Sequence, residues 1–190
     1  KSLMKNLFLV SLLVVLSFQL SAQAPDWMWA KGSVGVNYNY GNSVATDQHG
    51  NVYVAGAFFG DSINMSGISL IVNNGNTDFN IFINKYNSSG DLLWAKAFSS
   101  NGYDSAVLTV DKDDNIYLAG YFHGDSIKFG NTTLYNAGMD SFPNNSDIFI
   151  ARMDTSGNII WAQRAGTSGY DQAAAITTDN RGNIYVTGGF

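Results

Sequence analysis

Aspartates are almost the only side chains in this sequence that could do acid–base or metal chemistry. The chain of 190 residues has 15 acidic residues, all of them Asp, with no cysteine and only two histidines, His49 and His123. Neither histidine has a second ligand-type residue at the short spacing of a metal site or of a nucleophile–base pair. We therefore expect both histidines to lie in exposed loops, and we predict no catalytic residue and no cofactor.

The aspartates recur at nearly constant intervals, which favours a structural role. The recurring positions are Asp47, Asp111 and Asp179, then Asp61 with Asp125, and Asp78 with Asp147. A carboxylate that returns in every repeat is usually a turn or cap device, because it accepts hydrogen bonds from nearby backbone N–H groups. An acid–base pair instead needs two carboxyl groups in unlike environments. The repetition therefore argues against catalytic carboxylates.

One aspartate cluster resembles part of a calcium loop. Asp111, Asp113 and Asn115 alternate like the first ligands of such a loop. The loop would also need Gly at its sixth position and Glu at its twelfth, where this chain has Ile116 and Phe122. The alternatives are an incomplete calcium site and a plain hairpin turn, and we favour the turn, without a metal.

Aromatic residues offer a second kind of chemistry, the stacking of rings on sugars. Trp29, Trp94 and Trp161 are 65 and 67 residues apart and stand in the same local pattern, so we expect them to pack inside the fold. Tyr38, Tyr40 and Phe98 do not obviously repeat. We predict that these three are exposed and are the better candidates for ligand binding.

The aspartates sit in a repeated segment that reads as a hairpin turn followed by a strand. The pattern is Asp-x-x-Gly-Asn-x-Tyr-x-x-Gly, with Asp114 in place of the first Gly in the second copy. Asp accepts backbone hydrogen bonds at such a turn, and Gly adopts its left-handed conformation. The residues next to the tyrosine are apolar and point to the face opposite its ring, so the strand is apolar on both faces, which indicates burial on both sides. The closing Gly indicates close approach of another backbone. The repeated positions are Tyr53, Tyr117 and Tyr185, and Gly56, Gly120 and Gly188.

The whole pattern predicts an all-β fold. Each unit holds about four strands: the Trp strand, the strand before the Asp turn, the Tyr strand and an Asp-x-Phe-Ile strand. A further hairpin or loop is inserted at residues 60–77 and 124–146. Four antiparallel strands with both faces buried favour the blades of a β-propeller. A β-sandwich is the alternative, but it does not require a period near 65 residues. The predicted units are residues 27–91, 92–158 and 159–190.

These motifs together resemble the SBBP repeat, a β-propeller repeat of secreted bacterial proteins, often from Bacteroidetes. The order is Trp29, then Asp47 to Gly56, then Asp78 to Ile81, then the Ser89-Gly90 turn and a tryptophan again. The inserted hairpins and Asp114 depart from the family pattern. The resemblance implies a propeller and an exported protein, and relatives often carry a C-terminal sorting domain. It supplies no catalytic residues.

The N-terminus reads as a secretory signal peptide. Lys1 and Lys5 precede the apolar run from Leu7 to Phe18, and small residues follow. The run is shorter than the roughly 20 residues of a membrane-spanning helix. We predict cleavage after Ala22, so residues 1–22 are the signal and residues 23–190 the repeat region, with no membrane insertion afterwards. Losing two lysines changes the formal net charge from −5 to −7, which excludes nucleic acid and anionic membranes as partners.

Two functions remain open from the sequence. The first is a secreted or cell-surface propeller that works as a non-catalytic interaction or display scaffold for an extracellular protein or glycan. The alternative is the propeller portion of a secreted carbohydrate-active hydrolase or lyase. The repeat region holds about two and a half units, whereas a closed propeller has about 4 to 8 blades, so we expect an incomplete ring. We also predict that the first Trp strand, at residues 26–33, completes the last blade of the full ring.

Overall fold

The computed structural model describes residues 26–34, 38–72, 78–138 and 145–190, and all regular structure in these ranges is β. The predicted signal peptide and parts of both inserted segments lie outside them. Among the residues described, no helix is long and apolar enough to cross a membrane.

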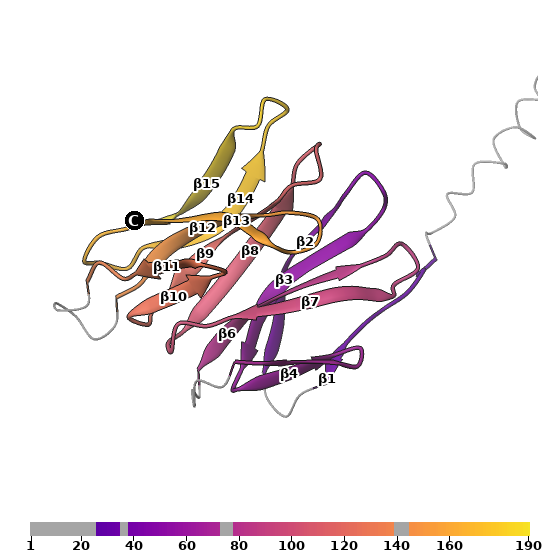
Figure 1. Ribbon diagram of the computed structural model, residues 1–190, viewed down its shortest axis with the longest axis horizontal. Coiled ribbons are helices and arrows are strands. Elements are labelled where there is room, and N and C mark those ends of the chain that lie inside the picture. The colour runs from indigo at the N-terminus through magenta and orange to yellow at the C-terminus, as the bar shows by residue number, and fades with distance from the viewer. Residues whose placement is uncertain (1–25, 35–37, 73–77, 139–144) are drawn as a thin grey trace, which may run out of the picture.

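Two four-stranded antiparallel sheets and a strand pair follow one another along the chain. The first sheet contains β2 (Asn39–Thr46), β3 (Val52–Phe59), β6 (Phe79–Tyr86) and β7 (Leu92–Phe98), in that order. The second contains β8 (Asp104–Val110), β9 (Ile116–Phe122), β12 (Asp147–Met153) and β13 (Ile159–Ala165). The pair is β14 (Gln172–Thr178) with β15 (Ile184–Gly189). The three sheets lie face to face in chain order (Figure 1), as blades of an open β-propeller.

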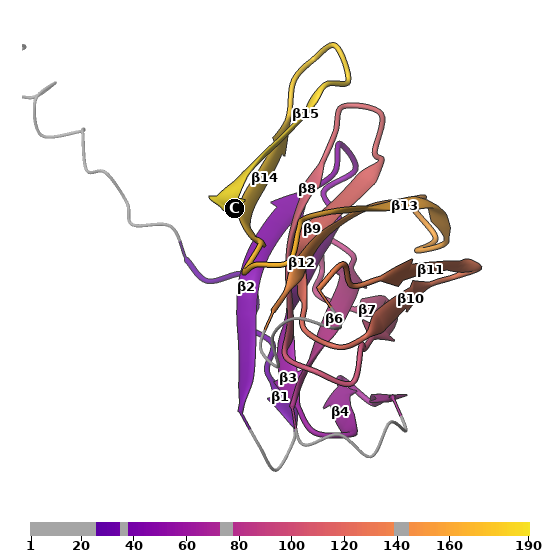
Figure 2. The ribbon, with the colours of Figure 1, turned by 90° about the vertical axis from the view of Figure 1, so that its left-hand side faces the viewer.

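In each complete blade, a small hairpin is inserted between the second and the third strand. β4 (Ser62–Met65) pairs with β5 (Ile68–Ile71), and β10 (Ser126–Phe129) pairs with β11 (Thr132–Tyr135). Both hairpins project beside the blades in Figure 2. The inserted hairpins expected from the sequence are therefore confirmed.

The core lies between the blades, as expected for strands with two apolar faces. The largest cluster joins Tyr53 and Ile81 of the first blade to Leu118 and Phe149 of the second, and all four are fully buried. A smaller cluster joins Ile148 of the second blade to Ala173 of the third. Burial between sheets removes the apolar side chains of both faces from water, which is the main stabilisation of such a stack.

The sheets are out of phase with the sequence units by one strand. Each Trp strand, β7 or β13, is the fourth strand of the sheet that precedes it in the chain, beside β6 or β12. The first unit as divided from sequence, residues 27–91, therefore starts with a strand that has no sheet of its own. The segment from Asp26 forms only a short strand, β1 (Ser33–Val34), which pairs with β4.

Candidate functional site

The three Asp turns share one hydrogen-bond pattern. Asp47 Oδ1 accepts the backbone N–H groups of His49 and Asn51, both at 2.9 Å. Its Oδ2 accepts from the Asn51 side chain at 2.7 Å and from the Tyr53 hydroxyl at 3.0 Å. Asp111 and Asp179 bind the matching donors of their own turns. The repeated Asp, Asn and Tyr are therefore one device that closes the hairpin.

These donors hold the aspartates in the charged form. Burial alone would raise the pKa of Asp47, but the bonds from Asn51, Tyr53 and His49 outweigh it, so its pKa lies below the usual value. At Asp179 the bonds from Asn183 lower the pKa to about 2.

The candidate calcium ligands belong to the second of these turns. Both oxygens of Asp111 already accept protein donors, and Asn115 Oδ1 accepts from Arg152 at 2.8 Å. Asp113 faces outward and pairs with Lys112 at 2.8 Å. The hairpin thus uses the oxygens of Asp111, while Arg152 of β12 uses Oδ1 of Asn115 and Lys112 pairs with Asp113.

Asp114 joins the Asp turns of the first two blades. It has the left-handed φ of 61° that the repeat elsewhere assigns to Gly. Its carboxylate accepts the Gln48 backbone N–H at 3.1 Å and lies 3.1 Å from Nδ1 of the exposed His49. Asp47, His49 and Asp114 come close enough to hold a metal, but the Asp47 oxygens are occupied as described above. His49 is an exposed turn residue, as expected.

The repeated tryptophans form a second joint between blades. The Trp94 indole N–H, on β7 of the first blade, donates to the Thr155 carbonyl in the β12–β13 turn of the second blade at 3.1 Å. Trp29 makes the matching bond to the Ser88 carbonyl in the β6–β7 turn, also at 3.1 Å. Each indole lies against the Gly of that turn, Gly157 or Gly90. The N-terminal segment thus packs on the first blade in the way that β7 packs on the second. It occupies the position that the fourth strand of a preceding blade would take.

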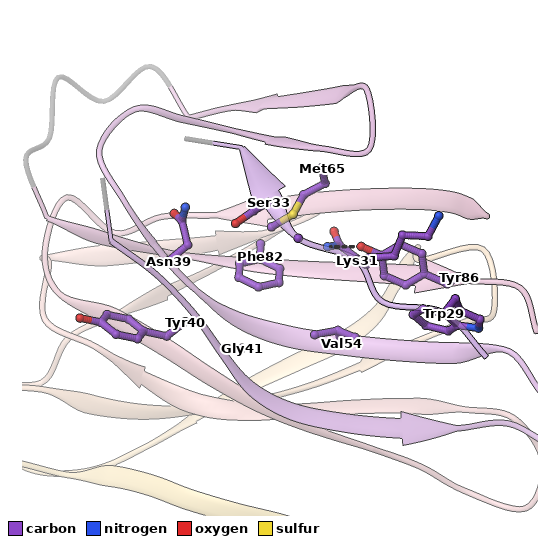
Figure 3. A pocket seen from close by; sticks show the side chains of 12 residues that line it. Trp29, Lys31, Ser33, Asn39, Tyr40, Gly41, Val54, Met65, Phe82 and Tyr86 are labelled. Carbon is purple, nitrogen blue, oxygen red and sulfur yellow. Dashed lines mark hydrogen bonds between the residues drawn. The ribbon is translucent and has the colours of Figure 1, made fainter. Parts of the chain in front are cut away.

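A pocket of about 280 Å³ remains beneath this segment. Figure 3 shows Trp29, Met65, Phe82 and Val54 among the side chains that line it. The side chain of Asn84 also lines it, and its buried Oδ1 has no hydrogen-bond partner among the described residues. On the second blade, the matching face is covered by the buried side chains of the first.

A larger cleft, of about 790 Å³, runs across the first strands of all three blades. Asn42 lines it from β2, Ser105 from β8 and Gln172 from β14, while Tyr121 and Tyr170 flank them. Of the described residues that line the cleft, none is charged. Asn42 also donates to the Ser105 hydroxyl at 2.9 Å, which ties the first two blades together at this edge.

His123 lies at the centre of the aromatic cluster at one end of this cleft. Its ring centroid is 5.6 to 6.0 Å from those of Tyr121, Tyr170 and Tyr103. The side chain is half-buried rather than in an open loop, so the exposed-loop expectation fails for this histidine. Burial lowers the pKa of His123, although Asp78 opposes this, so the ring is neutral at neutral pH.

A repeated Tyr-Asp motif that is not among the predicted site residues builds this cluster. Tyr103-Asp104 and Tyr170-Asp171 recur 67 residues apart, and Tyr38-Asn39 stands 65 residues earlier. Tyr38 is thus a repeated residue, although it is exposed as predicted. Phe98 is only half-buried and stacks on Phe129 at 4.8 Å, against the main core, so it is not an exposed binding residue.

Asp104 and Asp171 anchor the loops that enter β8 and β14. Asp104 is fully buried and accepts the Ser100 backbone N–H at 2.7 Å. Burial raises the pKa of Asp104 to about 8, despite that bond and one from the Ser100 hydroxyl. Asp171 accepts the Thr167 N–H at 2.6 Å. Close to it, the buried Asp147 pairs with Arg164 at 2.7 Å; the residue that corresponds to Arg164 in the first blade is Ala97.

Comparisons with known proteins agree with this architecture. The family described as "Beta-propeller repeat", SBBP, matches residues 160–188. The chain is 29% identical over 184 residues to an uncharacterized WD repeat-containing protein of Acanthamoeba polyphaga mimivirus, covering 85% of this chain and 13% of that protein. It is also 29% identical over 105 residues to the regulatory protein FlaEY of Caulobacter vibrioides, covering 55% of this chain and 11% of that protein. The stacked four-stranded sheets are those of an open β-propeller, and the family model matches one β-propeller repeat, at residues 160–188.

Proposed function

We propose that the chain is the propeller of an exported protein and works as a non-catalytic binding scaffold at the cell surface or outside the cell. The observation that carries this proposal is the uncharged cleft across the first strands of three blades, where exposed and half-buried aromatic and amide side chains gather. Concave surfaces with a few placed polar groups are the usual ligand sites of such folds.

The fate of the carboxylates supports a binding role. The aspartates of the Asp turns accept hydrogen bonds within their own hairpins, and Asp104 is fully buried and accepts from Ser100. None of these groups reaches the cleft with a free proton acceptor, which hydrolysis or lyase chemistry would need. The basic and apolar N-terminal pattern supports export.

Two measurements test the proposal. A tagged copy expressed in the native host should be found in the outer-membrane or culture-medium fraction, and surface protease should remove it from intact cells. The purified protein should release neither reducing ends nor unsaturated products from polysaccharides. Retention in the cytoplasm would contradict the export half, and catalytic turnover that survives repurification would contradict the scaffold half.

A further inference from the structure

We infer that the cleft across β2, β8 and β14 binds a neutral glycan, with Tyr170 and Tyr121 stacking on sugar rings. This inference rests on the proposed function and names the ligand class of the same scaffold. The cleft measures about 790 Å³, which lies within the range of roughly 300–1,000 Å³ typical of ligand sites.

The side chains of the cleft match the two surfaces of a sugar. A pyranose presents a face of C–H groups, which packs on an aromatic ring, and a rim of hydroxyl groups that both donate and accept. Tyr170 is 57% exposed and so offers a ring face to solvent. Gln172 can donate and accept hydrogen bonds. Asn42, whose amide N–H groups go to Ser105 and Ala106, can accept at Oδ1. The site therefore has stacking and hydrogen-bonding groups side by side.

The absence of charge selects among glycans. The described lining residues include no Lys, Arg or Asp, and His123 behind the tyrosines is neutral because burial lowers its pKa. A uronate or sulfate group would lose its hydration here without gaining a cation. A neutral chain carries no such cost, so we expect neutral polysaccharides to bind and acidic ones to be rejected.

The direction of the cleft favours a glycan over a peptide. An extended peptide that adds to a sheet edge runs parallel to one strand and binds through its main chain. The cleft groups instead lie across three strands from three different blades. Two of these strands are bulged, and the extra residues, Asn42 and Ala174, both line the cleft. Bulges commonly redirect side chains at functional sites. Here they add Asn42 and Ala174 to the residues that line the cleft across the strands.

The test is affinity electrophoresis of the protein through gels that contain neutral polysaccharides (mixed-linkage glucan, xylan, mannan) or acidic ones (alginate, polygalacturonate). We expect retardation by at least one neutral polymer and by neither acidic one. Tyr170→Ala should weaken that binding at least tenfold. The matched control is Tyr135→Ala, which removes a tyrosine that is 66% exposed on β11, outside the cleft, and should leave binding unchanged.

Gln172→Ala provides a second test in case Tyr170→Ala alters folding, which thermal unfolding will reveal. Binding that survives both cleft substitutions, or no retardation by any neutral polymer, would overturn the inference. Retardation by the acidic polymers alone would overturn it as well. A protein ligand that maps to the cleft would reject the glycan but keep the scaffold, whereas release of sugars from the gel would reject the scaffold itself.

Discussion

The first and second blades close the turn between their third and fourth strands with matching hydrogen bonds but with different residues. In the β6–β7 turn, Asn87 Oδ1 accepts the N–H groups of Ser89 and Asp91, and its amide donates to the Asp91 carboxylate at 2.9 Å. In the β12–β13 turn, Asp154 accepts the matching N–H groups and the Asn158 amide donates back to it at 2.9 Å. Asp and Asn have exchanged places, so the repeat conserves the set of donors and acceptors rather than the residue at each position.

The blades differ more where they meet other parts of the molecule. Lys85 of the first blade is buried and donates to the Thr155 carbonyl of the second blade at 3.2 Å. Its counterpart, Arg152, bonds to Asn115 within its own blade, and its buried Nε has no partner among the described residues. The first blade packs against the complete second blade, whereas the other face of the second blade packs against the strand pair β14–β15. The comparison separates contacts that close a blade from contacts that join blades.

The largest expected effect tests a feature that both blades share. A Cβ on Gly56 would lie 1.9 Å from the Tyr40 carbonyl oxygen, and one on Gly120 would lie 1.9 Å from that of Ser105. We expect Gly120→Ala, or Gly56→Ala, to lower the free energy of unfolding by about 3 kcal/mol because backbone must move. Gly189→Ala is the matched control, since its Cβ meets nothing within 4 Å. Equal midpoints for Gly120→Ala and Gly189→Ala in urea unfolding would contradict the close-approach argument.

The next effect tests the buried carboxyl at the first blade junction. The pKa of Asp104 is raised to about 8 when folded, above the unfolded value, so the folded state holds a proton that the unfolded state releases. Stability should therefore fall as pH rises from about 4 to about 8, by about 2.5 kcal/mol between pH 5 and pH 7.

The contribution of Asp104 is isolated by a difference. Asp104→Asn should remove this pH dependence, and the gap between variant and wild type in chemical unfolding should widen in favour of the variant toward pH 8. A gap that stays constant from pH 5 to pH 8 would show that Asp104 does not hold a proton in this range.

A smaller effect tests the tryptophan joint. Trp94→Phe removes the indole N–H that donates to the Thr155 carbonyl, and we expect a loss of about 1 kcal/mol. Trp161→Phe is the matched comparison, because no carbonyl in the described part of the chain accepts from its indole; its loss in the same chain should be less. Thermal unfolding of both variants measures the difference, and a larger loss for Trp161→Phe would refute the assignment of this bond to blade joining.

The smallest net effect is expected when the β6–β7 turn of the first blade is converted into the arrangement of the second blade's turn. Asn87→Asp alone places two carboxylates at the turn and should cost about 1 kcal/mol, because like charges face each other and a donor is lost. Adding Asp91→Asn restores the second blade's arrangement, and the double variant should return to within about 0.5 kcal/mol of wild type. A double-mutant cycle by urea unfolding measures this coupling. Purely additive losses would mean that the two turns are not equivalent.

The elements were predictable because each is specified locally. The Asp-x-x-Gly-Asn turns, the doubly apolar strands and the inserted hairpins all follow from spacing within about ten residues. Asp114 adopts the left-handed conformation that its place in the repeat predicts. Its bonds to Gln48 and His49 were not predictable, since they join turns about 65 residues apart in sequence.

The candidate site was harder to foresee than the elements. The sequence predicts Tyr40 and Phe98 as exposed binding residues, yet Phe98 packs against the core, and the tyrosines around His123 are not among the predicted site residues. The repeated Tyr-Asp motif was a visible signal. What it builds depends on which edges of the three blades meet, and a periodic pattern does not specify that.

By itself the sequence determined the repeat, the strands and the turns, because hydrogen-bond partners in a hairpin are near neighbours in the chain. Only the tertiary structure decided which sheet each Trp strand joins, which aspartate is buried and where a cleft opens. Those outcomes depend on the packing of one blade against the next. Packing is a property of pairs of surfaces far apart in sequence, and a strand with two apolar faces does not say which neighbour will cover either of them.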